Sequence, residues 1–286
     1  MKTTIYILIA IFILGIFATN YNTNSRLNNQ ITIQATISNP SNKDLSKSAE
    51  IIQKRMKTIG SGEFQINTII AKGQIQLTFD NSWSISEVKN LMVQKGRLEF
   101  YETFKQDRLM SILKNDSSLF ALFNHTVSEE ESSKLGCISI VDMQRIYQYI
   151  NNHNIDNQLK FVWDNLFESS TACLYALKLD KSGNALLNES DISNFKLNQT
   201  KESKTNYIEF SFNDLASNKW ANITKRNINM PIAITLDDVL IYLPIVRSEI
   251  KGGNCQLSGS FNHNQLNYIY AIISNGKMPL GFKIVN

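Results

Sequence analysis

The sequence lacks blocks of like charge, and after its N-terminus it has no apolar run long enough to cross a bilayer. Its 29 Lys and Arg residues barely outnumber its 25 Asp and Glu residues, and the two signs are interspersed. This pattern predicts a mixed, solvated surface and no nucleic-acid partner. At most one membrane span is expected. The remaining residues, about 260, can bury one large or two small domains, and we favour two.

Cysteine is scarce. Cys137, Cys173 and Cys255 form no CxxC pair, which excludes the usual zinc and thioredoxin motifs. The odd count limits disulfides, although one pair could bridge in an oxidising compartment. Isolated cysteines in apolar surroundings are more often small buried hydrophobic residues, and we favour that interpretation.

Catalytic motifs are also absent. His125, His153 and His263 lie in separate polar segments, without the spacing of metal ligands. No phosphate-binding loop, nucleophile elbow or dinucleotide-binding motif occurs. The sequence therefore predicts a protein that is not an enzyme, with no catalytic residue, no metal site and no cofactor.

Two short doublets have an ordinary structural explanation. Asp237-Asp238 stands between two apolar runs, where consecutive acidic residues are typical of a hairpin turn. Gly252-Gly253 precedes a predicted strand and does not lie between a strand and a helix. We expect the first pair to form a turn and the second to serve backbone geometry.

The N-terminus has the order of a signal sequence. Lys2 is followed by the apolar run Ile5 to Ala18, which is apolar on every face and so unlike an ordinary buried helix. Its length of about 14 residues suits a cleavable signal better than a span of roughly 20. The absence of charge from Thr3 to Ser25, and of an A-x-A cleavage site, leaves a short membrane anchor open. Residues 1–24 are therefore predicted to be an apolar helix that acts as a signal peptide or signal anchor.

Residues 31–103 alternate between the periods of strands and helices. The predicted elements are a strand at 31–37, a helix at 45–59, strands at 64–70 and 75–79, a helix at 85–92 and a strand at 98–101. The order β-α-β-β-α-β is that of a ferredoxin-like unit, in which both helices cover one face of an antiparallel sheet.

The rest of the chain divides into two parts. Residues 104–165 contain three short helical patterns, at 109–113, 119–123 and 140–150, and predict a mainly helical insertion. Residues 166–286 predict a second α+β domain. Its elements are strands at 174–179, 185–187, 208–212, 232–236, 239–243 and 282–285, and helices at 213–225 and 266–273.

The C-terminal part resembles a known family. An apolar strand from Pro231 ends in Asp237, and a return strand reaches Pro244. Glu249-Ile-Lys-Gly-Gly253, then Gly259-Ser-Phe261 and Ile273-Ser-Asn-Gly-Lys-Met-Pro279 follow in order. This ordered set is similar to the first large periplasmic domain of SecD, a membrane subunit of the Sec protein-export system.

Upstream fragments extend the resemblance to about residues 45–103 and 170–285. Ile51-Ile-Gln-Lys-Arg55 leading to Gly60 is similar to the end of a SecD helix, and Gly96-Arg-Leu-Glu-Phe100 to a SecD strand. SecD continues into several transmembrane helices that this sequence lacks, and its Asp-Leu-Gln-Gly-Gly stretch has no counterpart near residues 27–36. We expect a diverged relative that does not itself conduct protons.

The resemblance implies a non-enzymatic accessory of Sec-dependent export that binds unfolded secretory polypeptide or Sec channel subunits. It also implies that Ile5 to Ala18 is a retained anchor, giving a single-pass protein of the bacterial cytoplasmic membrane with its bulk in the periplasm. The alternative is an envelope-anchored interaction module that kept the SecD fold without an export role.

A groove or an exposed sheet edge could bind an extended chain with little dependence on its sequence. The candidate contact residues are Tyr242, Pro244, Ile245, Gly252, Gly253 and Phe261. The alternative is that these residues only shape and fill the fold.

Overall fold

The computed structural model describes residues 27–114, 116–123, 132–153, 158–167, 169–199, 206–259 and 261–285. The predicted N-terminal helix with Ile5 to Ala18, and also His125, lie outside these ranges. Within them, no helix combines the length and the apolar character that crossing a membrane requires.

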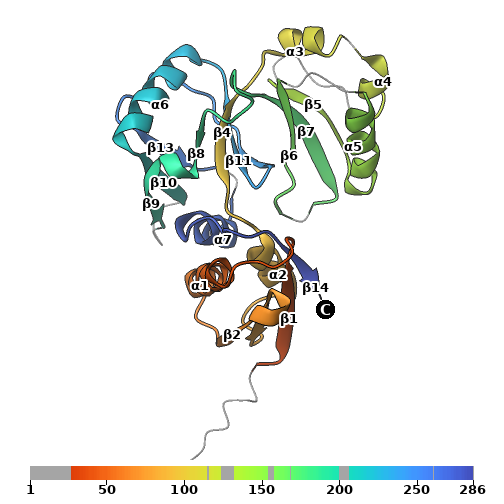
Figure 1. Ribbon diagram of the computed structural model, residues 1–286. Coiled ribbons are helices and arrows are strands. Elements are labelled where there is room, and N and C mark those ends of the chain that lie inside the picture. The colour runs from red at the N-terminus through yellow and green to blue at the C-terminus, as the bar shows by residue number, and fades with distance from the viewer. Residues whose placement is uncertain are drawn as a thin grey trace, which may run out of the picture.

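A four-stranded sheet forms one end of the molecule (Figure 1). Its order is β14-β1-β3-β2, and all neighbours are antiparallel. The strands are β1 (Asn29–Ala35), β2 (Phe64–Ile69), β3 (Gln74–Phe79) and β14 (Phe282–Val285). The helices α1 (Asn42–Ile59), α2 (Ile85–Val93) and α7 (His263–Ser274) pack on the face of the sheet where the alternating apolar residues are buried.

The predicted strand at 98–101 is present, but its place in the ferredoxin-like sheet is wrong. β4 (Leu98–Glu102) leaves this sheet and pairs with β11 (Ile232–Leu236), while β14 takes the edge beside β1. β4 is buried on both faces, whereas β14 is mostly half-buried, as suits the edge of a sheet with one covered face. Both α7 and β14 fall within the predicted 166–286 domain yet pack with the 31–103 unit.

Arg55 joins these distant parts of the chain. The side chain is fully buried on α1 and donates to the carbonyl oxygens of Gln94 at 2.5 Å, Lys95 at 3.0 Å and Gly276 at 3.3 Å. These oxygens lie at the C-terminal ends of α2 and α7, where helix carbonyls lack intrahelical partners. Burial lowers the pKa of Arg55 to about 10, against the opposing effect of nearby Asp237.

A seven-stranded sheet forms the centre of the other end, in the order β5-β7-β6-β12-β11-β4-β8. Its remaining strands are β5 (Lys134–Ser139), β6 (Leu159–Trp163), β7 (Thr171–Lys178), β8 (Leu187–Asn188) and β12 (Val239–Tyr242). A further pairing of Glu102 on β4 with Lys178 on β7 closes β4, β7, β6, β12 and β11 into a ring. Each of the five strands contributes one residue to a shared buried cluster: Tyr101, Val162, Leu177, Ala233 and Leu240.

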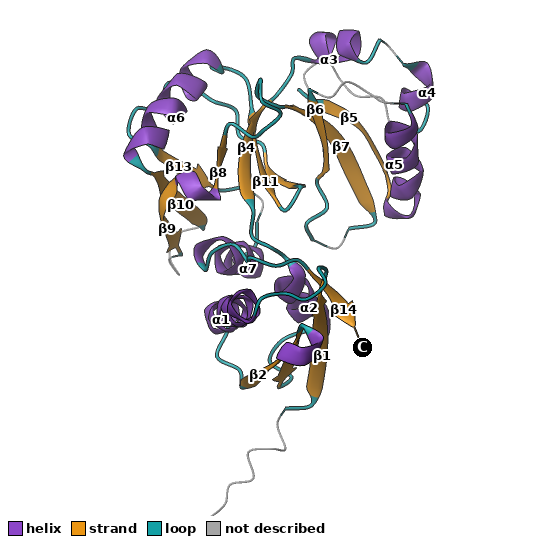
Figure 2. Ribbon diagram, in the orientation of Figure 1, coloured by secondary structure: helices purple, strands orange, loops and turns teal. Residues whose placement is uncertain are grey.

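The segment 104–165 contains the predicted helices, and it also contributes two strands to this sheet. The predicted helices are present as α3 (Gln106–Ile112), α4 (Ser117–Phe120) and α5 (Met143–Asn152), and they lie on the outer side of β5 and β7 (Figure 2). The strands β5 and β6 between and after them were not predicted. In β5 the alternation is interrupted at Gly136, where the register with β7 shifts, so the strand period is hard to recognise.

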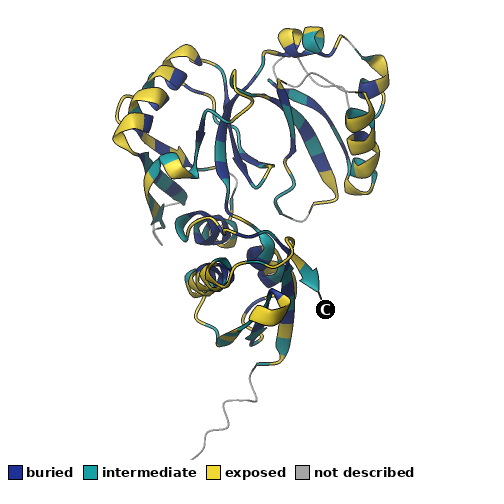
Figure 3. Ribbon diagram, viewed as in Figure 1, coloured by how far each residue is buried: buried dark blue, intermediate teal, exposed yellow. Residues whose placement is uncertain are grey.

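A third sheet has the order β13-β10-β9 and lies beside α6 (Asp214–Arg226). Its strands are β9 (Ile192–Asn198), β10 (Tyr207–Phe212) and β13 (Asn254–Leu257). The rings of Phe100, Phe210, Phe212 and Trp220 contact one another with centroid separations of 5.2 to 5.9 Å. They belong to the same buried apolar cluster as the core of the four-stranded end. Figure 3 shows buried residues at both ends. Short 3-10 turns occupy Ile70–Lys72, Ile140–Asp142 and Glu189–Asp191.

Two of the three cysteines form a disulfide. Cys137 on β5 lies directly opposite Cys173 on β7, and their sulfurs are bonded. The buried-hydrophobe interpretation is therefore wrong for this pair and correct for Cys255, which is free and buried. Burial raises the pKa of the Cys255 thiol to about 12.

Candidate functional site

Tyr242 and Phe261, two of the candidate contact residues, line the same hollow of about 470 Å³. We call it the aromatic hollow, and its other apolar lining residues are Phe167, Tyr175, Leu240, Ile241 and Leu243. Tyr175, Leu240 and Leu243 also belong to, or pack on, the cluster inside the strand ring. The hollow is thus an opening onto the interior of the ring.

Local geometry fixes the two aromatic side chains. Tyr242 ends β12, and its hydroxyl shares a hydrogen bond of 3.2 Å with Ser258 Oγ. Gly259 has a φ of +137°, a conformation that L side chains rarely adopt, which lets the chain turn between Ser258 and Phe261. Tyr242 and Phe261 thus line one hollow from the end of β12 and from the residue just before the start of α7.

Two more hollows adjoin the aromatic hollow. One of about 530 Å³ shares Phe167 and Gln265 with it, and one of about 350 Å³ shares Glu87, Asn264 and Tyr268 with the second. We call the three together the groove. It follows the N-terminal part of α7 and ends at Trp83.

The groove has an acidic and polar lining beyond its aromatic residues. Asp164 lies in the aromatic hollow and Glu87 in the other two, whereas no Lys or Arg occurs among the described lining residues. Asp164 accepts a hydrogen bond of 2.7 Å from the amide of Cys173, and Glu87 accepts from Ser84 in a helix capping box. Since the whole chain carries a net charge of +4, this acidic lining does not simply reflect composition.

Pro244 and Ile245 lie outside the groove, beside the start of β11. The Pro244 carbonyl accepts a hydrogen bond of 3.0 Å from the amide of Ile232, and Ile245 pairs with Pro231. The Ile245 side chain is 49% exposed. These two residues continue the pairing of the β12 segment with the start of β11 but do not line the aromatic hollow.

Gly252 and Gly253 are also separate from the groove. Gly253 has a φ of +65°, and a Cβ there would lie 2.0 Å from Ser217 Oγ. Its carbonyl accepts a hydrogen bond of 2.8 Å from the amide of Phe212. Gly252 has no such constraint, since a Cβ there would have its nearest neighbour 4.0 Å away. The structure therefore brings together two of the six candidate residues.

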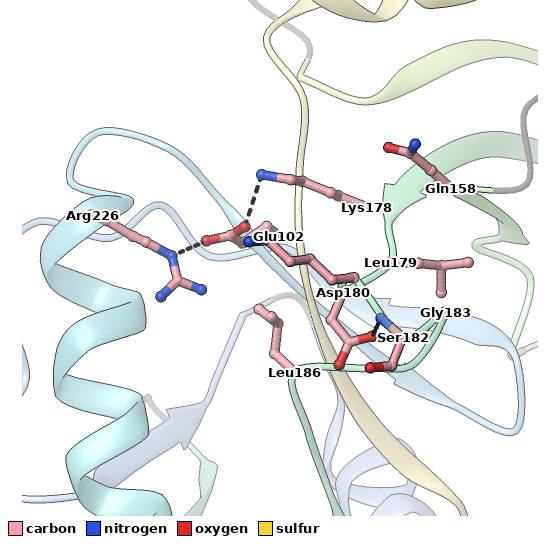
Figure 4. Close-up of a pocket in the computed structure, with 10 residues that line it drawn as sticks. Glu102, Gln158, Lys178, Leu179, Asp180, Ser182, Gly183, Leu186 and Arg226 are labelled. Atoms are coloured by element: carbon pink, nitrogen blue, oxygen red, sulfur yellow. Dashed lines mark hydrogen bonds and ion pairs between the residues drawn. The ribbon is translucent and has the colours of Figure 1, made fainter.

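Sequence reasoning missed a second cavity, of about 720 Å³, beside Glu102 (Figure 4). Glu102 is only 7% exposed, and its carboxylate pairs with Arg226 at 2.5 Å and Lys178 at 3.1 Å. Asn227 donates a further hydrogen bond of 2.7 Å. Burial alone would raise the pKa of Glu102, but the hydrogen bonds from Asn227, Arg226 and Lys178 outweigh it and hold that pKa below its usual range. Glu102 ends a strand that is otherwise largely apolar, and a buried carboxylate needs charged or hydrogen-bonding partners. That requirement was the signal in the sequence that could have indicated this cluster.

No metal centre is evident in the part of the chain that the structure describes, because no three His, Cys, Asp or Glu residues there gather closely enough to hold an ion. The predicted turn at Asp237-Asp238 is confirmed. Both residues have positive φ, at 49° and 67°, as a two-residue hairpin turn between β11 and β12 requires.

Comparisons with known proteins agree with this fold. Residues 168–280 match the family described as the SecDF P1 head subdomain. The chain aligns over 90% of its length with the solved structure of SecDF described as a membrane component that enhances protein export. It covers 98% of that chain, with a TM-score of 0.52 and 17% identity. The protein therefore has the mixed α+β fold of the SecDF P1 region.

Sequence relatives are protein translocase subunits SecD. The subunit of Acidaminococcus fermentans is 29% identical over 106 residues, which are 37% of this chain and 25% of that protein. The subunit of Rickettsia prowazekii is 36% identical over 78 residues, which are 27% of this chain and 15% of that protein. The predicted resemblance to a periplasmic domain of SecD is thereby confirmed, and the matched segment spans a quarter or less of these curated relatives.

Proposed function

We propose that this protein is a non-enzymatic accessory of Sec-dependent protein export that binds translocating polypeptide in the groove. The observation that supports the proposal is the aromatic hollow, which Tyr242 and Phe261 line together with residues of the cluster inside the strand ring. The relationship to SecD supplies the process in which such binding would act.

The chemistry of the groove suits an unfolded chain. Aromatic side chains provide large apolar contact area at low entropic cost, so they bind apolar side chains of varied shape. Beyond the hollow, amide and hydroxyl groups of Ser84, Asn90, Asn262 and Gln265 line the wall. Such groups hydrogen-bond peptide backbone, which is the same in every sequence.

The charge of the groove adds a preference. Asp164 and Glu87 are its only charged residues among those described, so a segment that carries Lys or Arg would be attracted. The groove would therefore favour extended segments that combine apolar and basic side chains.

The proposal places the domain on the outer side of the bacterial cytoplasmic membrane, held by Ile5 to Ala18 as a single-pass anchor. That segment is apolar and follows Lys2, the order expected when the N-terminus stays inside. In this position the groove would face polypeptide as it leaves the Sec channel, and channel subunits would be its neighbours.

Site-specific photocrosslinking in living cells tests the proposal. A photoreactive amino acid at Tyr242 or Phe261 should capture secretory polypeptides during export, because both residues line the aromatic hollow. The matched control is the same amino acid at Leu215, which is 72% exposed on α6 and outside the groove. Capture of unrelated envelope proteins alone, or equal capture from Leu215, would contradict an export role.

A further inference from the structure

The cavity beside Glu102, which we call the cationic pocket, has a chemistry opposite to that of the groove. Its wall carries Lys178, Lys181 and Arg226. It opens where β6 begins and β7 ends, at Gln158 and Lys178, whereas the aromatic hollow includes Asp164, beyond the other end of β6. The two sites therefore lie toward opposite ends of this strand pair.

The two carboxylates of the cationic pocket are already engaged. Glu102 accepts from Arg226, Asn227 and Lys178, so both of its oxygens are used. Asp180 Oδ1 accepts hydrogen bonds of 2.8 Å from the backbone amides of Ser182 and Asn184, which close the turn that follows Asp180. Glu102 therefore needs no further cation, and Asp180 holds its own turn through Oδ1.

The three cations retain donors. Arg226 contacts Glu102 through Nε, and its two terminal Nη groups have no hydrogen-bond partner among the described residues. Figure 4 shows the guanidinium turned with these groups away from Glu102. Lys178 makes one ion pair, with Glu102, and Lys181 is exposed on the rim of the cavity. Three positive and two negative groups leave the lining with one excess positive charge.

From this arrangement we propose that the cationic pocket binds the carboxylate of an acidic peptide side chain. The two Nη groups of Arg226 form a planar fork that matches the two oxygens of a carboxylate, and Glu102 holds that fork in place from behind. Lys181 would add a third donor from the rim. The site is separate from the groove, and the proposal does not depend on the export role.

Two features favour a carboxylate on a peptide over a phosphate. One excess positive charge balances a singly charged carboxylate, whereas a phosphate near neutral pH carries about two negative charges. Leu179 and Leu186 also line the cavity and give apolar contact for the methylene stem of a glutamate side chain. A phosphate has no such stem.

Nitrogen-15 NMR of the full chain in detergent micelles tests the assignment. The probes are a glycine-flanked glutamate peptide with blocked termini, the same peptide with glutamine, and inorganic phosphate. The glutamate peptide should shift the Arg226 Nε–H signal and the backbone signals of Ser182 and Gly183, and the glutamine peptide should not. Equal shifts from both peptides, or saturation by phosphate without a response to the glutamate peptide, would overturn the assignment.

Variants locate the binding. Arg226→Lys keeps the charge beside Glu102 but removes the fork, and should weaken binding of the glutamate peptide about tenfold. Lys181→Gln, on the exposed rim, should weaken it several-fold. The control is Lys196→Gln, an exposed lysine on β9 in another sheet, which should leave binding unchanged. Thermal melting verifies that each variant is folded, and identical binding by Lys181→Gln and Lys196→Gln would refute the site.

Discussion

The carboxylate of Asp237 accepts a hydrogen bond of 3.0 Å from the backbone amide of Gly96, which lies 141 positions earlier in the sequence. A second bond of 2.9 Å comes from the amide of Arg97, and the Asp237 amide in turn donates to the Arg97 carbonyl. The hairpin turn between β11 and β12 is thereby fixed to the turn between α2 and β4. This relationship explains why an acid ends the β11 strand, for which the sequence suggested only turn formation.

We predict that Asp237→Ala lowers the free energy of unfolding by about 2–4 kcal/mol. The change removes a charged acceptor and leaves two amides without their partner. The matched control is Asp238→Gly, which keeps the positive φ of the turn and loses only ion pairs of a half-exposed carboxylate with Arg97 and Lys160. That change should cost under about 1 kcal/mol. Urea denaturation compares the two, and equal losses would contradict a special role for Asp237.

Glu102 should make stability depend on pH below neutrality. Its folded-state pKa is lowered, so its contribution is fully present above the unfolded pKa and is lost as pH falls through the folded pKa. Glu102→Gln should therefore be less stable than the natural protein at pH 7, by about 1.5–3 kcal/mol. Below the ordinary glutamate pKa the difference should shrink, because the natural carboxyl becomes protonated as pH falls through its lowered folded-state pKa. Chemical denaturation at several pH values measures both, and parallel curves for the two proteins would disprove the prediction.

Local patterns predicted most elements because alternation and helical spacing are properties of neighbouring residues. The capping box of Ser84 and Glu87, for example, needs only four consecutive residues and begins α2 where a helix at 85–92 was predicted. Partnership between distant strands is not local. Nothing in Leu98–Glu102 specifies β11 as its neighbour, and nothing in the last strand specifies β1. The predicted sheet was therefore wrong where its fourth strand comes from the far end of the chain.

For the candidate site too, the sequence predicted individual residues but not which of them come together. The sequence predicted Tyr242 and Phe261 as contact residues, but that both line one hollow depends on how the end of β12 and the segment before α7 fold together. The cationic pocket was missed because Glu102, Lys178 and Arg226 are separated in sequence and meet only when the strand ring closes. The order of charged residues along the sequence does not predict which strands close the ring, or which charged residues then meet.

The cysteines should differ in reactivity. In the folded, oxidised protein no cysteine should react with iodoacetamide, because Cys137 and Cys173 are bonded and Cys255 is buried with a raised pKa. Unfolding without reductant should expose one thiol, and unfolding with reductant three. Mass spectrometry counts the added groups, and labelling of Cys137 in the unreduced protein would contradict the disulfide.

Breaking the disulfide should also lower stability. The bond closes a loop with a sequence separation of 36 and joins β5 to β7. Replacing both cysteines by serine should cost about 2–4 kcal/mol. Cys255→Ser is the control for removing a thiol without removing the bond, although its burial means that some cost is expected there too. A double variant as stable as the natural protein would show that the bond contributes nothing to the fold.

The adjacent glycines Gly252 and Gly253 should differ in how much the stability of the fold depends on them. Gly253→Ala places a methyl group at positive φ and against Ser217, so it should lower the free energy of unfolding by about 1–3 kcal/mol. Gly252→Ala meets open space at an ordinary φ and should be nearly neutral. Equal melting temperatures for the two alanine variants would contradict the backbone explanation for Gly253, because only that position combines the positive φ with the close approach of α6.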